Sequence, residues 1–246
     1  MPYVTVTALS HPGLIRDHNE DSLVAGPWTL CATVTENPQT LVFPRGHPLV
    51  VAVADGIGGQ PGGEVASALT VRQLAAVGPA LDGAQAVQDA LKLCNQAVYA
   101  AADRDPELLT MGTTVAGAVV LEESLLVFNV GDSRVLGVTE DGLRQVSVDD
   151  SPPLQPGRRT TSLVTQALGG APGFSPITPH VSTAPLTPGD RYLICTDGLT
   201  DPVPRDELDE LLRAHEDGRA AFELWRAAIE AGGPDNITLA LVGVGD

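Results

Sequence analysis

The feature that most constrains this chain is a set of apolar runs, each followed by an aspartate beside a glycine. Three runs have this form: residues 50–54 before Asp55-Gly56, residues 125–130 before Gly131-Asp132, and residues 192–196 before Asp197-Gly198. A fourth aspartate, Asp235, precedes the last apolar run, residues 237–244. Continuous apolar runs of this length are typical of strands buried on both faces.

If the ends of those strands meet, their carboxylates form a cluster of oxygen ligands with no histidine or cysteine beside it. Such oxygen sites suit hard cations such as Mg²⁺ and Mn²⁺. The first hypothesis is therefore metal-assisted chemistry on an anionic substrate.

The charge of the chain excludes two classes of partner. Its 246 residues contain 31 acidic and 14 basic side chains, for a net charge of −17. Sequence-independent binding to nucleic acid requires Lys and Arg to displace the counterions of phosphates, and anionic membrane surfaces attract basic segments. We therefore expect neither a nucleic-acid nor a membrane partner, and we interpret most other acids as solubility charge.

The sequence also indicates a cytoplasmic protein. The N-terminus shows no basic segment followed by an apolar one, so no signal peptide is expected. No apolar run approaches the ~18 residues of a membrane span. The three cysteines are far apart and form no CxxC pair, which indicates neither a disulfide framework nor a zinc site.

The spacing of apolar residues predicts the order of secondary structure. Strands are expected over residues 3–8, 22–25, 49–54, 113–121, 124–130, 134–139, 181–184, 191–195 and 237–244. Helices are expected over residues 63–77, 84–102, 206–215 and 219–231. We expect a strand and a surface loop over residues 27–47, a hairpin turn at Asp141-Gly142, and a loop over residues 151–173. Because the helices come in pairs rather than one per strand, the pattern favours antiparallel sheets with helices packed outside, an α+β domain.

Each acidic motif has a structural alternative when it is taken alone. The glycine-rich segment after Asp55 could be a phosphate-binding loop or a plain turn, but it lacks the GxxxxGK[ST] pattern and a nearby lysine. Asp132 alone is better explained as part of a tight hairpin turn. Asp197 could mark a strand end, Asp201 could cap a helix, and Asp235 could belong to a turn.

The segment Arg16-Asp17-His18-Asn19-Glu20-Asp21 combines a guanidinium with several acids. Arginine can bind two phosphate oxygens at once, and Glu20 and Asp21 could orient metal-bound waters. The alternative is a solvated polar loop. The five histidines are scattered without an H-x-x-x-H pair, so neither a histidine metal site nor a Ser-His-Asp triad is indicated.

Seven motifs together resemble the bacterial form of the PPM-type (PP2C-like) metal-dependent Ser/Thr protein phosphatases. They are RDHNED at 16–21, VADGIGGQPGGEVAS at 53–67, MGTT at 111–114, VGDSR at 130–134, TQALGG at 165–170, CTDGLTD at 195–201 and GGPDNIT at 232–238. Each motif is weak, but seven in this order cover the chain from end to end. The resemblance implies one domain over residues 1–246, a four-layer αββα sandwich of two antiparallel sheets flanked by helix pairs.

The resemblance also implies roles for individual residues. Asp55 would bridge two Mn²⁺ or Mg²⁺ ions, the Gly56 carbonyl would bind one of them, and Asp197 and Asp235 would bind the other. Asp132 would hold a weaker third ion, together with Asp197 and Asp201. Arg16 would hold the substrate phosphate, and Glu20 and Asp21 would act through water.

The chain departs from the family pattern at three places. Ile57 stands where animal members carry a histidine proposed as general acid, a residue that many bacterial members also lack. Asp149-Asp150-Ser151 stands in place of the usual DHS. The flap segment around residues 151–165 is shorter than in many bacterial relatives, so substrate preference does not carry over.

These implications give the main functional hypothesis. A hydroxide shared by two metal ions, with its pKa lowered towards ~7, attacks phosphoserine or phosphothreonine in a phosphoprotein made by a Ser/Thr kinase. We expect the protein to act as a monomer. Two alternatives stay open: a catalytically silent relative that binds a phosphoprotein as a regulator, and a hydrolase of a small phosphoester.

Overall fold

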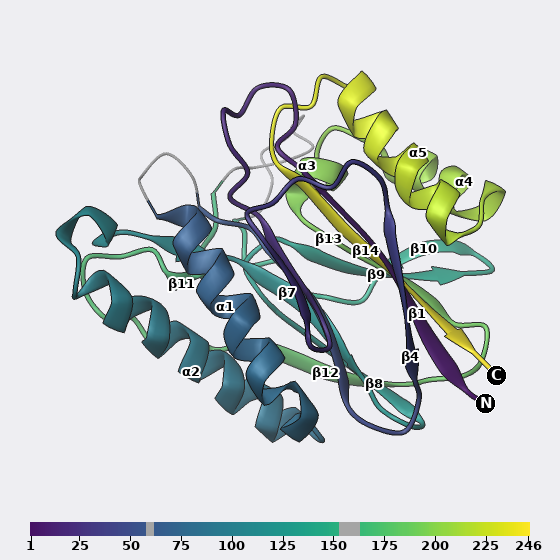
Figure 1. Cartoon of the computed structure of the whole chain (residues 1–246), viewed down its shortest axis with the longest axis horizontal. Helices are drawn as coiled ribbons and strands as arrows, with labels where there is room; N and C mark the ends of the chain where they lie inside the picture. Colours follow the sequence, from purple (N-terminus) through teal and green to yellow (C-terminus); the bar gives the residue numbers. More distant parts are fainter. Residues whose placement is uncertain (58–61, 153–162) are drawn as a thin grey trace.

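The computed structural model describes residues 1–57, 62–152 and 163–246. In this part of the chain two six-stranded antiparallel sheets face each other, and helices cover their outer faces (Figure 1). The fold class predicted from the sequence is therefore confirmed.

The first sheet has strand β14 near its centre. Its strands follow the order β10 (Gly142–Gln145), β9 (Arg134–Thr139), β13 (Arg191–Cys195), β14 (Ile237–Gly245), β1 (Tyr3–His11) and β4 (Gln39–Pro44). The antiparallel register pairs Cys195 with Leu239 and His11 with Ile237. The end of β13, the start of β14 and the end of β1 therefore lie at the same end of this sheet.

The second sheet brings further strand ends to an edge of its own. Its strands follow the order β12 (His180–Pro185), β8 (Ser124–Val130), β7 (Val115–Val120), β5 (Leu49–Ala54), β2 (Ser22–Ala25) and β3 (Trp28–Cys31). Ser22 pairs with Ala54, and Val115 pairs with Val130. The residues before β2, after β5 and after β8 consequently share one end of the sheet. A small sheet of β6 (Gly112–Thr113) and β11 (Leu168–Gly169) adjoins this end, where Gly56 bridges to Thr113.

Alternate side chains of a strand point to opposite faces of the sheet. The two faces of β5 therefore contact two different cores. Val50 and Ala52 belong to the core beneath α1 (Gly63–Val77) and α2 (Ala84–Ala102), whereas Val51 and Val53 belong to the core between the sheets. Because both faces are buried, the strand is apolar throughout.

The helices α4 (Arg205–Ala214) and α5 (Asp217–Glu230) form a third core with the outer face of the first sheet. The short helix α3 (Asp197–Thr200) follows β13, and two 3₁₀ turns, η1 (Gly78–Ala80) and η2 (Pro106–Leu108), complete the described helices. Three cores separate four layers in the order αββα. Among the described residues, no helix combines the length and the apolar character needed to cross a membrane.

Most predicted elements are confirmed. The bounds of α1, α2, β2, β5, β8, β9 and β13 agree with the prediction, as does the hairpin turn at Asp141-Gly142, and those of β1, β12, β14, α4 and α5 differ by one to three residues. Residues 27–47 contain two strands, β3 and β4, rather than one. The short elements β10, β11 and α3 were not predicted.

The single strand predicted over residues 113–121 was wrong. It is divided into β6 and β7 at Thr114, whose amide donates to the Asp55 carbonyl (2.9 Å) and whose hydroxyl contacts Ser133 Oγ (2.7 Å). These bonds to distant residues take Thr114 out of the strand pairing. Of the predicted flap segment, residues 153–162 lie outside the described residues.

Candidate metal centre

Aspartates from both sheets meet at one end of the sandwich. Asp197 follows β13 and Asp235 precedes β14 in the first sheet, while Asp21 precedes β2, Asp55 follows β5 and Asp132 follows β8 in the second. After burial, the charges of the other four are the causes that raise the pKa of Asp55, so the five carboxylates are electrostatic neighbours. In Figure 1 the purple loop after β1 and the yellow loop before β14 lie together beside α3, and the Leu14 amide donates to the Gly233 carbonyl (2.8 Å).

Asp55 and Asp197 lie at the centre of this cluster. Burial raises the pKa of Asp55 well above its usual value, and the neighbouring aspartates add to the shift. Burial, followed by the charge of Asp235, also raises the pKa of Asp197. Divalent cations would offset the repulsion between these carboxylates.

Asp21 is fully buried and incompletely satisfied. Its Oδ2 accepts a hydrogen bond from the Thr196 hydroxyl (2.9 Å), but Oδ1 has no partner among the described residues. Burial is the largest cause that raises the pKa of Asp21 to about 7. A buried oxygen without a partner is costly, and a water held by a cation would supply one. The residues present therefore fit an oxygen-ligated divalent ion.

Glu20 and Gly56 approach each other through their backbones. A Cβ atom on Gly56 would lie 2.7 Å from the Glu20 carbonyl oxygen and 2.6 Å from the Gly63 carbonyl oxygen, so only glycine fits. The buried Glu20 side chain lies beside His18 and Glu64, and one ligand atom from each of the three lies within 4.8 Å of the others. This group borders Gly56 and extends the acidic site outwards.

Asn236 joins the two sequence ends of the site. Its Oδ1 accepts from the Glu20 amide (2.8 Å), and its Nδ2 donates to the carbonyls of Pro12 and His18 (both 3.0 Å). The sequence interpretation gave Asn236 no role beyond a turn. Its place in the motif GGPDNIT, directly after Asp235, was the only signal.

Asp132 lies on a turn that leaves little freedom. Its side chain is buried, and burial, followed by the charge of Asp197, raises its pKa to about 7. Gly131 has a positive φ of 103°, and a Cβ there would lie 2.6 Å from Thr114 Cβ. Asp201 also contributes to the pKa shift of Asp132, so the two acids are electrostatic neighbours.

Arg16 approaches the cluster from the surface. Its Nη2 lies 2.8 Å from Asp235 Oδ2, and its side chain is 44% exposed. The hydrogen bond to Asp235 is the largest cause that raises the pKa of Arg16. The guanidinium is thus directed at the acidic site and remains accessible from solvent.

Two cysteines are excluded as nucleophiles by their surroundings. Burial raises the pKa of Cys94 and of Cys195 to about 12. Neither forms an appreciable fraction of thiolate near neutral pH.

Comparison with known proteins now decides the family. The sequence model of the family described as protein phosphatase 2C matches residues 40–237 of the chain. The chain belongs to the protein phosphatase 2C family.

Two curated relatives that the chain resembles are bacterial phosphatases. The chain is 32% identical over 254 residues to the serine/threonine protein phosphatase PstP of Mycobacterium tuberculosis, covering 97% of this chain and 45% of PstP. It is 31% identical over 250 residues to the serine/threonine phosphatase stp of Listeria monocytogenes, covering 94% of this chain and 92% of the relative. The chain thus spans about half the length of PstP (45%).

Solved structures agree over almost the whole fold. The crystal structure of M. tuberculosis PstP/Ppp superposes with a TM-score of 0.83 at 29% identity, covering 99% of this chain and 100% of that one. The PstP catalytic domain in complex with two manganese ions superposes with a TM-score of 0.82 at 30% identity, covering 100% of both chains. This establishes the αββα fold independently of the sequence motifs.

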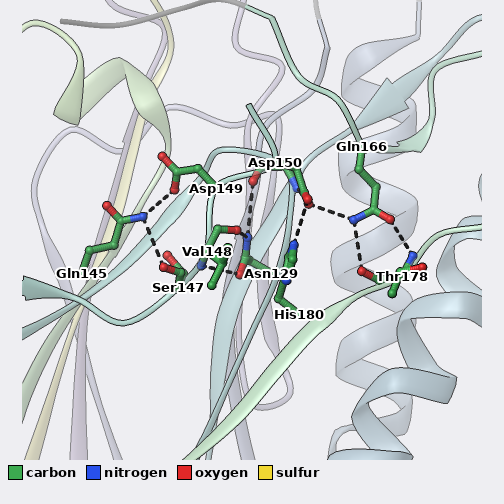
Figure 2. Close-up of polar contacts among 10 residues, drawn as sticks. Asn129, Gln145, Ser147, Val148, Asp149, Asp150, Gln166, Thr178 and His180 are labelled. Carbon is green, nitrogen blue, oxygen red and sulfur yellow. Dashed lines mark hydrogen bonds and ion pairs between the residues drawn. The ribbon is translucent and has the colours of Figure 1, made fainter. Parts of the chain in front are cut away.

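In the present structure, the predicted site residues lie at the same end of the sandwich. The acids Glu20, Asp21, Asp55, Asp132, Asp197, Asp201 and Asp235, the Gly56 backbone and the Arg16 guanidinium all belong to segments that meet there. Their individual roles stay predictions. The sequence interpretation did not find the polar network in Figure 2, which links Asp149 and Asp150 to residues on several elements.

Proposed function

We propose that this protein is a metal-dependent serine/threonine protein phosphatase. One observation carries the proposal: buried aspartates from both sheets converge where their charges repel one another and an arginine faces them from solvent. Membership of the phosphatase 2C family and the manganese complex of PstP support the same conclusion.

We assign the metal ligands by this geometry and by the family resemblance. Asp55 and the Gly56 carbonyl would hold one Mn²⁺ or Mg²⁺ ion, Asp55, Asp197 and Asp235 would hold a second, and Asp132 with Asp197 and Asp201 would hold a weaker third. Such ions, when bound, make water nucleophilic near neutral pH and offset phosphoryl charge. Glu20 and Asp21 would accept hydrogen bonds from the ions' water ligands.

Arg16 would bind the phosphoryl oxygens of the substrate. Its guanidinium is exposed and is oriented by its hydrogen bond to Asp235. An arginine can donate two parallel hydrogen bonds to a phosphate and stabilise the charge of phosphoryl transfer. The Ile57 side chain has no ionisable group that could protonate the leaving oxygen. That proton would therefore come from water.

The wider biological role is proposed on the same basis. We expect phosphoproteins made by a Ser/Thr kinase as substrates, a single domain over residues 1–246, a monomer and a cytoplasmic location. Three unpaired cysteines are compatible with a reducing compartment.

One assay tests the activity. Purified protein is incubated with a phosphothreonine peptide and Mn²⁺, with a chelator, and as the variant Asp197→Asn. We expect metal-dependent phosphate release that the chelator abolishes and that Asp197→Asn lowers by more than the ~10- to 100-fold typical of losing an outer-shell partner, because a direct ligand is weakened. Asp217→Asn is the matched control: Asp217 pairs with Arg191 (2.6 Å) at the opposite end of β13, so its loss should leave kcat/KM close to that of wild type.

The alternatives predict different outcomes. A silent phosphoprotein-binding relative would release no phosphate under any condition. A small-phosphoester hydrolase would turn over an aryl phosphate but no phosphopeptide. Either result would overturn the proposed function.

A further inference from the structure

Asp150 is the centre of a polar network beside the metal centre that the proposed mechanism does not use. Its side chain is 13% exposed, and Oδ1 lies 2.8 Å from His180 Nε2 at the start of β12. Its Oδ2 accepts from the Gly131 amide and from Gln166 Nε2, both at 2.9 Å. Figure 2 shows Asp150 between His180 and Gln166, with dashed lines to both. A carboxylate has about four lone-pair sites in all, so three side-chain bonds use most of its capacity.

The backbone of Asp150 reinforces two of these links. Its amide donates to the Gly131 carbonyl (2.8 Å), so Asp150 and Gly131 bond each other reciprocally. Its carbonyl accepts from the Thr165 amide (2.7 Å). Gln166 in turn contacts the Thr178 backbone through both atoms of its amide. Asp150 therefore joins the turn after β8 to residues 165–178 and to β12.

Asp149 holds the other end of the same turn. Its Oδ2 accepts from Nε of Arg134 (2.9 Å) and pairs with Nη2 of the same guanidinium (2.8 Å). Arg134 Nη1 donates to Thr200 Oγ1 (2.8 Å) in α3, the helix that begins at Asp197. Gly131 and Arg134 flank Asp132 in the sequence. Two consecutive acids thus fix the turn that carries Asp132, one at each end.

A turn fixed at both ends would keep Asp132 in place as a cation ligand. Asp132 is buried among other acids, which repel it once it is ionised. A turn held at one end only could relax by moving Asp132 away from Asp197. Hydrogen bonds from an outer shell prevent such relaxation, and their loss typically costs about 10- to 100-fold in metal affinity or activity.

We propose that Asp150 is a positioning residue that fixes Asp132 for a third, weak cation and fixes residues 165–178 as part of the substrate-side wall. The second half of this statement rests on a cavity of about 480 Å³ lined by Ile57, Thr165, Gln166 and Ile177. Ile57 directly follows Gly56, so this cavity borders the metal centre. The proposal rests on the proposed phosphatase function for its kinetic consequences, but not for its metal-binding consequences.

Position 150 departs from the family pattern that the sequence motifs led us to expect. Where the family resemblance leads us to expect histidine, the chain has Asp150, and a histidine at position 180 supplies the complementary ring. An exchange of the two residues would keep one carboxylate and one imidazole in contact. This provides a rescue experiment.

The test counts bound Mn²⁺ by isothermal titration and by the EPR signal of free Mn²⁺, for the full chain and its variants. In Asp150→Asn we expect two tight sites unchanged and a third site weakened about 10- to 100-fold. With a phosphothreonine peptide we expect KM to rise and the Mn²⁺ concentration for half-maximal rate to rise. Gln166→Ala leaves the Gly131 bonds in place, so it should raise KM alone.

Three further variants separate positioning from general damage. Asp150→His alone should behave like Asp150→Asn or worse, and the double variant Asp150→His with His180→Asp should recover part of the third-site affinity. Asp217→Asn removes another partly buried acid from an ion pair, and it should change neither the third-site Mn²⁺ affinity nor KM.

The outcomes are decisive in either direction. A third site of wild-type affinity in a folded Asp150→Asn, or the absence of any third site from the wild-type protein, overturns the assignment. If Asp150→Asn does not fold, His180→Phe, which removes the bond to Asp150 Oδ1, supplies the Mn²⁺ comparison, and His180→Gln, which can still donate to Asp150, is its control. If no variant, wild type included, releases phosphate, the proposed function fails while the Mn²⁺ count still tests the positioning role.

Discussion

At the scale of single residues, the geometry of Arg16 matters more than its charge. Its Nη2 reaches Asp235 Oδ2 at 2.8 Å while much of the side chain stays in solvent. Lysine would keep the charge but lose the planar pair of donors that fits a phosphate. For Arg16→Lys we therefore expect kcat/KM on a phosphothreonine peptide to fall about tenfold or more, since one charge-assisted hydrogen bond contributes about 1.5–3 kcal/mol, with little change in Mn²⁺ affinity.

Steady-state kinetics with saturating Mn²⁺ check this expectation. Arg226→Lys is the matched control, because Arg226 is 50% exposed and pairs with Glu223 within α5, which supplies none of the predicted site residues. Equal kcat/KM for Arg16→Lys and wild type would remove Arg16 from the substrate site.

The residue scale also shows what the sequence could and could not predict about the site. Asp55, Asp132, Asp197 and Asp235 could be predicted because each interrupts an apolar run beside a glycine. The link between Asp150 and His180 could not, because it joins residues 30 apart through a strand pairing that periodicity does not specify. Side-chain partners depend on the tertiary arrangement, and motifs report only the local chain.

At the scale of elements, the short helix α3 sets the distance between Asp197 and Asp235. A Cβ on Gly198 would lie 1.9 Å from the Asn236 carbonyl oxygen, which is backbone and cannot move aside easily. Gly198→Ala should therefore push α3 away from the segment before β14. We expect the free energy of unfolding to fall by about 1–3 kcal/mol, the usual cost of overpacking, and Mn²⁺ affinity to fall as the ligands separate.

Urea denaturation and Mn²⁺ titration of the variant measure both effects. Gly218→Ala is the control, since a Cβ on Gly218 in α5 would meet no atom within 4 Å. That control should be neutral or slightly stabilising. If Gly198→Ala binds Mn²⁺ like wild type, α3 does not set the ligand spacing.

The length of an element decides whether the spacing of its apolar residues can predict it. Long strands and helices such as β5 and α2 were predicted with their bounds because their apolar pattern extends over several turns or residues. Helix α3 has four residues, DGLT, which are too few to show a period. The break at Thr114 likewise depends on the hydrogen bonds to Asp55 and Ser133, which lie 59 and 19 residues away.

At the scale of the whole molecule, the fold is a means of holding acids together against their repulsion. Two sheets deliver carboxylates to one end, and burial raises the pKa of Asp21 and of Asp132 to about 7 from ordinary aspartate values of about 3.9. A raised pKa means that the folded state binds these protons more tightly than the unfolded state. The contribution to stability is therefore complete below pH ~4 and is lost as the pH rises towards ~7.

Divalent cations should reverse that loss, because they bind the ionised carboxylates of the folded protein only. The increase in melting temperature caused by Mn²⁺ should then be larger at about pH 8 than at about pH 5.5, where protons compete for the same oxygens. Differential scanning calorimetry at both pH values, with Mn²⁺ and with chelator, measures it. In chelator, Asp132→Asn should be less sensitive to pH than wild type over this range, because one of the titrating groups is gone. An Mn²⁺ effect that is equal at the two pH values would mean that the cations do not bind these acids.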